Sequence, residues 1–395
     1  MVTKTAATAS KRKKSVRRPA SGAKRPFRFY DNRQKYLTFV NTCDEKWKVA
    51  ERAAQELAYV KPQPPCFRLF DAGMGDGTVL THLMRAMHQR FPTIPFLVVG
   101  KEISLEDVRL TLQKLPDRFV EHAASVVVVT NLYYAEAPWL MPADVSKAAA
   151  LNWREVVLDG SSAYEFGEQL QALEPELIDG WQVGPSPKTG NPLYVRPSVL
   201  VIYRGDHRFL LDPVIPKRGH TDGNYDLVLA SQPWRSRMPA SFRVSKVLAP
   251  LVRSLRPHGR VLTVQSRGGD PGLELVQQLW PGEEPFTVDR HELIRTLKAE
   301  LGRDAKRYRL KAPTDRKALL RYRMHTLPSE IGDNIGTSTL LAAWNAAIYV
   351  AQIEDDRLEA VVSSPDYLAA TAKILQARGG LWFNDEAFVV SRNGI

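Results

Sequence analysis

FRLFDAGMGDGTVL, residues 67–80, is the most informative stretch of the chain. An apolar run ends in Asp71, and three glycines follow at every second position, Gly73, Gly75 and Gly77. Apolar residues with helical spacing begin immediately afterwards. A buried strand that leads through a glycine loop into a helix makes a nucleotide-sized crevice at the strand's C-terminal end. Glycine suits such a loop because a side chain would keep a ligand away from the backbone.

Two features distinguish this loop from one that binds a nicotinamide dinucleotide. That loop would have its third glycine at position 78, which is Thr78 here, and an acid about 20 residues further on. In this chain Asp71 precedes the glycines, and the next apolar run, PFLVVGKE, ends in Glu102, 31 residues after Asp71. The arrangement resembles the class I, Rossmann-like, S-adenosylmethionine-dependent methyltransferases, whose loop reads acid-x-G-x-G-x-G and whose second strand closes on an acid. The alternative is a glycine turn in a dehydrogenase-like or unrelated α/β domain.

The resemblance implies S-adenosyl-L-methionine as the cofactor and S-adenosyl-L-homocysteine as its product. The aminoacyl end of the cofactor would lie along the glycine loop, and Glu102 would accept hydrogen bonds from the two hydroxyls of the cofactor's ribose. Asn131 would lie near the adenine amino group, or would simply cap a turn at a strand end. The residues that we assign to the cofactor are Asp71, Gly73, Met74, Gly75, Gly77, Glu102, Ile103, Asn131 and Ser231.

The candidate acceptor site is the sequence Ser231-Gln232-Pro233-Trp234. Several amino-methyltransferases have Asn, Asp or Ser here, followed by two prolines and an aromatic residue. Ser231 and Trp234 match that pattern, whereas Gln232 replaces the first proline. The resemblance implies a planar nitrogen acceptor whose NH2 donates to the polar side chain and a backbone carbonyl while the ring stacks on it. The alternative is a strand end with a packing tryptophan. Tyr133 is the third catalytic candidate, because its aromatic run would wall the pocket or pack in the core.

The pattern of elements predicts an α/β fold with a doubly wound, mostly parallel sheet. Near-continuous apolar strands indicate a sheet that is covered on both faces. The β/α alternation breaks between about 140 and 222, which predicts an inserted α+β subdomain that shapes the substrate site or forms a dimerisation arm. The expected segments are a disordered basic tail at 1–28, the two halves of the cofactor-binding domain at 29–140 and 223–330, the insertion at 141–222, and C-terminal helices with a closing hairpin at 331–395.

The sequence also predicts four local elements. A helix is expected over 44–57, either covering the cofactor or serving only as core. Another is expected over 105–119, with Ser104 as its N-cap. A hairpin-like pair is expected over 199–212, and a closing hairpin would turn at Asn384 and Asp385.

The composition limits where the protein works and what it binds. The 395-residue chain has a net charge of +12, but residues 1–28 hold ten Lys or Arg and no acid, so the remainder is nearly neutral. We expect the tail to be solubilising, to contact nucleic acid or another polyanion, or to be a nuclear address in a eukaryote. Two cysteines and the absence of an apolar leader predict a reducing, cytoplasmic location, and no apolar run is long enough to span a membrane. The eight scattered histidines predict no metal site.

The function that the sequence favours is methyl transfer to a nitrogen of a small or medium-sized molecule. The nearly neutral body favours a small acceptor, whereas the tail and the SQPW stretch favour an RNA or DNA base or a protein bound to nucleic acid. A non-catalytic binding subunit of the same fold is a third hypothesis, and a homodimer is compatible with each. Aminopropyl transfer is a weaker hypothesis, because residues 230–237 are basic where polyamine synthases carry acids.

Overall fold

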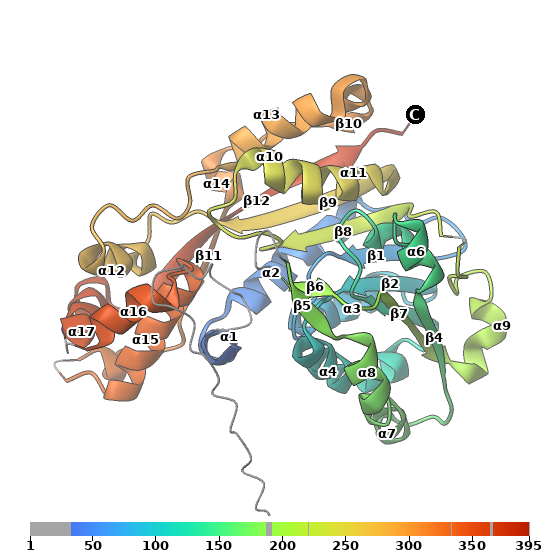
Figure 1. The fold of residues 1–395 in the computed structure, drawn as a ribbon, viewed down its shortest axis with the longest axis horizontal. Helices are drawn as coiled ribbons and strands as arrows, with labels where there is room; N and C mark the ends of the chain where they lie inside the picture. The colour runs from blue at the N-terminus through green and yellow to red at the C-terminus, as the bar shows by residue number, and fades with distance from the viewer. Residues whose placement is uncertain (1–32, 187–191, 220, 333, 364–365, 395) are drawn as a thin grey trace, which may run out of the picture.

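The computed structural model describes residues 33–186, 192–219, 221–332, 334–363 and 366–394. The predicted basic tail over 1–28 therefore lies outside the described residues. A ten-stranded sheet runs through the molecule in the order β10-β12-β9-β8-β1-β2-β3-β7-β4, with β11 paired to β12 beside β10 (Figure 1). Its strands are β1 (Phe67–Asp71), β2 (Phe96–Lys101), β3 (Ser125–Thr130), β4 (Asn152–Leu158), β7 (Ser198–Arg204), β8 (Tyr225–Ser231), β9 (Leu255–Ser266), β10 (Tyr308–Arg309), β11 (Leu319–Arg323) and β12 (Trp382–Arg392). A small second sheet pairs β5 (Val183–Pro185) with β6 (Pro192–Tyr194).

The middle of the main sheet is parallel. Strands β3, β2, β1, β8 and β9 run in the same direction and follow the 3-2-1-4-5 order of doubly wound folds. The chain reverses its direction of travel across the sheet between β1 and β8, so the topological switch point lies there. Strand β12 is antiparallel to β9 and separates it from β10. The predicted α/β, doubly wound, mostly parallel fold is confirmed.

Helices cover both faces of this sheet, because alternate apolar side chains of each strand point to opposite sides. One face packs against α2 (Glu45–Glu56), α3 (Thr78–Arg90), α4 (Leu105–Lys114), α5 (Pro116–Glu121), α7 (Ala163–Gln171) and α8 (Glu174–Gly180). The other packs against α10 (Ala240–Arg243), a π-helical turn (Val244–Leu248), α11 (Ala249–Arg253) and α13 (Arg290–Leu301). Shorter helices are α6 (Val145–Ala149), α9 (Arg208–Leu211) and α14 (Asp315–Ala318), and 3-10 turns occur at Leu57–Tyr59, Ala137–Trp139, Gly205–His207, Gly302–Arg307 and Pro328–Ile331.

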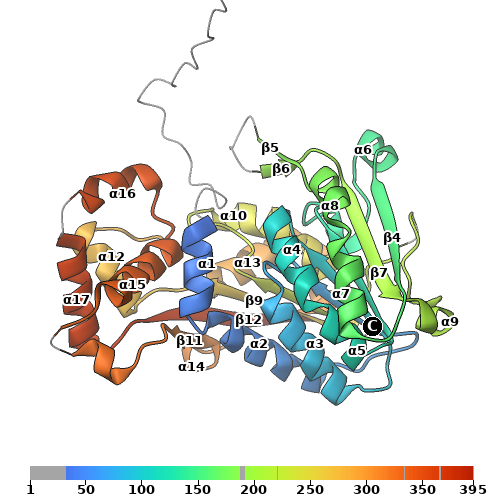
Figure 2. The same ribbon diagram turned by 90° about the horizontal axis from the view of Figure 1, so that it is seen from below.

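A third apolar core lies beside the sheet. It joins α1 (Arg33–Thr42) to the C-terminal helices α12 (Pro271–Leu279), α15 (Thr337–Val350), α16 (Asp355–Val362) and α17 (Asp366–Arg378). Figure 2 shows α1 between these helices and α4, so the first described helix bridges the two parts of the molecule. The first described helix thus packs against helices from the last third of the chain.

The local predictions on the N-terminal half are largely confirmed. The helix over 44–57 is α2, and Ser104 caps α4 by accepting a hydrogen bond from the Asp107 amide. The helix expected over 105–119 is two helices, because Pro116 begins a new one and lacks the amide that would continue the first.

Both predicted hairpins are wrong. All seven residues of β7 are buried, and the strand pairs with β3 on one side and β4 on the other, while the sequence after it turns into α9. Asn384 and Asp385 do not turn: they are buried in the middle of β12, which runs unbroken between β9 and β11. The insertion over 141–222 therefore supplies β4 and β7 to one edge of the main sheet, in addition to α7 and α8.

Candidate cofactor and acceptor pocket

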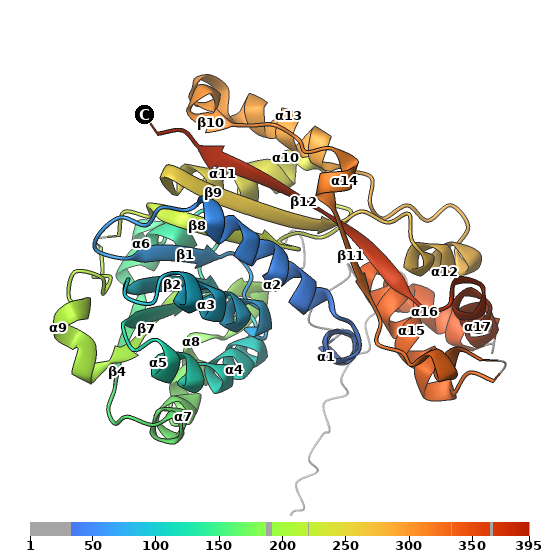
Figure 3. The same ribbon diagram turned by 180° about the vertical axis from the view of Figure 1, so that it is seen from behind.

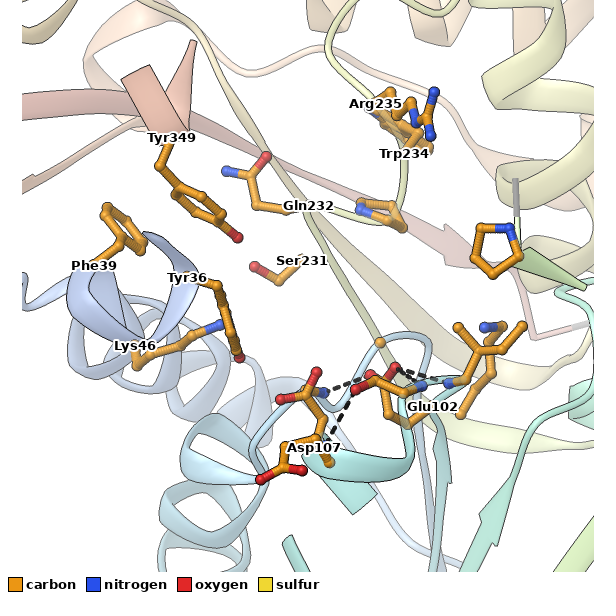
Figure 4. Close-up of a pocket in the computed structure, with 18 of the residues that line it drawn as sticks. Tyr36, Phe39, Lys46, Glu102, Asp107, Ser231, Gln232, Trp234, Arg235 and Tyr349 are labelled. Carbon is orange, nitrogen blue, oxygen red and sulfur yellow. Dashed lines mark hydrogen bonds between the residues drawn. The ribbon is translucent and has the colours of Figure 1, made fainter. Parts of the chain in front are cut away.

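A cavity of about 600 Å³ opens at the C-terminal ends of the parallel strands, beside the switch point between β1 and β8. The loops after β1, β2 and β8 form its floor, and α1, α2, α4 and α15 supply its walls. Figure 4 shows Glu102 and Asp107 at one end, Ser231 and Trp234 across from them, and Tyr36 and Tyr349 on a third side. Doubly wound folds bind ligands in this position.

The glycine loop brings backbone to the surface of the cavity. Gly73 lines it, and a Cβ added there would meet no atom within 4 Å, so the position opens into the cavity. Gly75 has φ +52° and also lines the cavity, with Tyr36 close above: an added Cβ would lie 2.9 Å from the tyrosine oxygen. Gly77 has φ +78° and begins α3. Only glycine adopts these two conformations without strain.

Asp71 lies beneath this loop. Its Oδ1 accepts a hydrogen bond from the Gly73 amide at 3.2 Å, while its buried Oδ2 has no partner among the described residues. Burial raises the pKa of Asp71 to about 7. Asp107, at the start of α4 and on the cavity wall, is similar: burial, with the nearby Glu102, raises its pKa to about 7. The Asp71 carboxyl therefore keeps one oxygen that no described residue uses.

Glu102 holds the two loops together. Its Oε2 accepts from the Gly75 amide at 3.0 Å, and its Oε1 accepts from the amides of Ile103 at 2.7 Å and Ser104 at 2.9 Å. A carboxylate offers about four acceptor positions, so one remains for a ligand. Glu102 and Ile103 both line the cavity.

The acceptor side has an unusual backbone. Ser231 ends β8 and lines the cavity, and Gln232 follows with φ +47°. Its side chain bridges two strands, since Nε2 donates to Asp385 Oδ2 at 3.0 Å and Oε1 accepts from the Ser266 amide at 3.2 Å. Proline is locked near φ −65° and could not take this conformation. The structure thus explains why the sequence departs from the two-proline pattern at Gln232.

Trp234 lines the cavity but is also tied to the core. Its Nε1 donates to Gln265 Oε1 at 3.1 Å, and Arg243 lies over its ring at 5.7 Å. Gln265 donates onward to Glu386 Oε1 at 2.8 Å. The orientation of the Trp234 ring is therefore fixed by contacts with Gln265 and Arg243.

Five of the predicted site residues do not line the cavity, and the first of them is Asp71, which lies beneath the glycine loop. The buried Asn131 side chain donates to the carbonyls of Gly180 and Arg196, both at 2.9 Å, and accepts from the Ser198 amide, so it fastens β3 to the following segment. Tyr133 stacks on Tyr194 with ring centres 4.4 Å apart. The other two are Met74, which packs against Gly100, and Gly77, which packs against Thr111.

Several cavity residues were not predicted from the sequence. Lys46 stands in the first turn of α2, 5.6 Å from the centre of the Tyr36 ring and 3.7 Å from Glu45. From the aromatic run that was expected to wall the pocket, it is Tyr134 and not Tyr133 that lines the cavity, with Lys101 4.6 Å from its ring centre. Further lining residues are Tyr36, Phe39, Asp107, Trp181, Arg235, Tyr322 and Tyr349. The apolar face of 44–57 predicted α2, whose first turn lines the cavity. The sequence also predicted C-terminal helices, but no local pattern indicated that α15, or α1, lines the cavity.

Within the described part of the chain, no group of three or more His, Cys, Asp or Glu side chains could hold a metal ion. None of the helices described there is long and apolar enough to cross a membrane.

The strand order, with β12 antiparallel beside β9, is that of the class I S-adenosylmethionine-dependent methyltransferase fold. No protein-family model and no curated protein matches the chain. Similar solved structures include a SAM-dependent methyltransferase from Archaeoglobus fulgidus, 10% identical over 92% of this chain and 100% of that one, with a TM-score of 0.31. A geranyl diphosphate methyltransferase with its diphosphate and sinefungin is 14% identical over 87% of this chain and 76% of that one, with a TM-score of 0.31. The fold assignment rests on the strand order, since these structures superpose only loosely.

Proposed function

We propose that the protein is an S-adenosylmethionine-dependent methyltransferase that acts on a nitrogen of a small or medium-sized planar molecule. One observation carries the proposal: the glycine loop after β1, the acid after β2 and the Ser231–Trp234 stretch after β8 face the same cavity. These are the parts that bind the methyl donor and the acceptor in the fold that the chain adopts.

The cofactor end of the cavity has suitable groups for each part of this ligand. Gly73 lets the aminoacyl end approach the backbone, and the unpartnered Oδ2 of Asp71 lies beneath it. Glu102 faces the cavity with an acceptor position left for ribose hydroxyls. When bound, the cofactor supplies a methyl group that its sulfonium charge already activates, so the chain's task is to align the acceptor and exclude water.

The acceptor end fits a flat group that carries an N–H. The Ser231 side chain and the Gln232 carbonyl would accept from the nitrogen, and Trp234 offers an aromatic face held by Gln265. A cavity of about 600 Å³ lies within the usual size of a small-molecule pocket. It suits one cofactor and one modest acceptor, or a single base turned out of a nucleic acid. The buried, free thiols of Cys43 and Cys66 fit work in a reducing cytoplasm.

Calorimetric titration with S-adenosylmethionine and S-adenosylhomocysteine tests the cofactor proposal. We expect micromolar affinity in the wild type and a loss of at least about tenfold in Glu102→Ala, equal to about 1.4 kcal/mol. Glu51→Ala on the exposed side of α2 is the matched control and should bind like the wild type. No binding of either ligand to the wild type would overturn the proposal.

A panel of nitrogen acceptors with a labelled methyl donor tests the reaction itself. We expect Ser231→Ala to lower the rate of methyl transfer, because Ser231 would contact the acceptor, and calorimetry with S-adenosylmethionine measures its contribution to cofactor binding separately. Cofactor binding without transfer to any nitrogen compound or nucleic acid would favour a non-catalytic binding subunit.

A further inference from the structure

The near-neutral body conceals an uneven charge distribution. Residues 303–323 contain nine Lys or Arg and two acids, a net charge of +7, whereas everything outside 1–28 has a net charge of only +2. The rest of the body is therefore negative. All nine cations are exposed, and we call them the basic edge: Arg303, Lys306, Arg307, Arg309, Lys311, Arg316, Lys317, Arg321 and Arg323.

The basic edge follows one border of the sheet. Strand β10 pairs with the end of β12 and β11 pairs with its beginning, both on the side away from β9. Figure 3 shows β10, α14 and β11 in sequence along β12. Eleven residues of extended strand span roughly 35 Å, so the cations form a band of about that length.

The charges of this band are largely unopposed. Within the described residues, Arg307 is the single member with an ion pair, to Asp304 at 3.4 Å. The other acid of the segment, Asp315, pairs with Arg290 and Arg267, which are not part of the band. Unpaired cations aligned over about 35 Å repel one another, so a surface of this kind gains most from a linear polyanion.

We propose that the basic edge binds the phosphate backbone of double-stranded nucleic acid. A duplex carries one charge per about 1.7 Å and could lay about ten base pairs along the band. Single strands need exposed aromatic platforms on which to stack, but Tyr308 is half-buried and Tyr322 is buried. A membrane surface would favour apolar residues among the cations, and Leu319 is the one exposed large apolar residue of the segment.

The basic edge is separate from the cavity but adjoins it. In β11 the Tyr322 side chain lines the cavity, while the flanking Arg321 and Arg323 are exposed on the opposite side of the strand. A bound duplex would therefore pass behind the rim of the pocket. The proposal does not depend on the methyl transfer proposed above.

The test compares two triple variants of the full-length chain. Lys311→Gln/Arg316→Gln/Lys317→Gln removes three charges from the band. Lys217→Gln/Lys246→Gln/Lys373→Gln removes three exposed charges from other surfaces and is the matched control. Binding to DNA and RNA duplexes of about 20 base pairs, twice the length of the band, is measured by fluorescence anisotropy over a range of salt concentrations.

We expect the slope of log affinity against log salt concentration to be smaller in magnitude by about 2 to 3 in the first variant, since each phosphate contact contributes about 0.9 to that slope. The control should keep the wild-type slope, and the two duplex types show which nucleic acid is preferred. Equal slopes in both variants would overturn the proposal, as would tighter binding to phosphatidylserine vesicles than to either duplex. Unchanged calorimetric affinity for S-adenosylmethionine in the first variant verifies that it is folded; should no form bind that cofactor, circular dichroism supplies this control.

Discussion

Gly73 and Gly77 look alike in the sequence but perform different tasks. Gly77 has φ +78°, and an added Cβ would lie 2.6 Å from Thr111 Oγ1, whereas a Cβ on Gly73 would enter the cavity without contact. Gly77→Ala should therefore lower the free energy of unfolding by about 1–3 kcal/mol. Gly73→Ala should leave it within about 0.5 kcal/mol but weaken S-adenosylmethionine binding. Urea unfolding and calorimetry on both variants would refute this assignment if the two effects were exchanged.

Asp71 makes the stability of the protein depend on pH. Burial raises its pKa from 3.8 to about 7, so between these values the folded chain keeps a proton that the unfolded chain has released. The free energy of unfolding must then fall as pH rises from about 4 to about 7. Asp71→Asn removes this contribution, at about 1.4 kcal/mol per unit of pKa difference.

Urea unfolding at pH 5 and pH 8 measures the effect. We expect Asp71→Asn to gain stability over the wild type mainly at pH 8, while the exposed control Asp212→Asn gains none at either pH. An equal gain for Asp71→Asn at both values would contradict the buried position of this carboxyl.

The sequence predicted those site residues that lie at strand ends. Gly73, Gly75, Glu102, Ser231 and Trp234 line one cavity because parallel strands bring their carboxyl ends to the same edge of a sheet. Asn131, which follows β3, was expected to line the cavity but does not. Strand β7 pairs with β3, and the Asn131 side chain accepts a hydrogen bond from the Ser198 amide at the start of β7. No local pattern reveals which strand will occupy a neighbouring position.

Helices α1 and α15 act as one wall of the pocket. The Asn345 side chain of α15 donates to the Lys35 carbonyl of α1 at 2.9 Å, and Phe39 stacks near Tyr349 at 4.9 Å. Asn345→Ala removes the hydrogen bond, worth about 1 kcal/mol. Amide hydrogen exchange in α1 should then quicken about fivefold, with no change in β1. Leu341→Ala, at a half-exposed position of the same helix, should leave the amide exchange rate of α1 unchanged. Faster exchange in both variants would mean that the Asn345 hydrogen bond does not hold α1 in place.

Element types were predicted better than element partners. The apolar runs correctly indicated β7 and β12 as strands, yet the hairpins expected for them do not form. In β12, Asn384 and Asp385 are residues typical of turns, but their side chains bond to Arg321 and Gln232 on other elements. Long-range partners of this kind leave no trace in the spacing of a short segment.

Across the whole molecule, a buried polar network links the pocket to the C-terminal strand. Glu386 accepts from the Arg290 side chain at 2.8 Å, from the Arg290 amide at 2.7 Å and from Gln265, which also holds Trp234. Glu386→Ala would leave a buried arginine without this partner and should cost about 3–5 kcal/mol. Glu274→Ala breaks the exposed pair with Arg378 and should cost less than about 1 kcal/mol. Thermal and urea unfolding measure both changes. Similar losses of unfolding free energy in Glu386→Ala and Glu274→Ala would exclude a special role for the buried network.

The meeting of α1 with α15 also sets an order of events during synthesis. Lys35 and its partner Asn345 are separated by 310 positions, and β12, which lies between β9 and β10 in the sheet, is synthesised after α15. A ribosome-bound chain that has exposed only its first 300 residues therefore carries the glycine loop and Glu102 but no completed pocket. The wall formed by α1 and α15 can therefore be completed only when segments 310 positions apart have both left the ribosome.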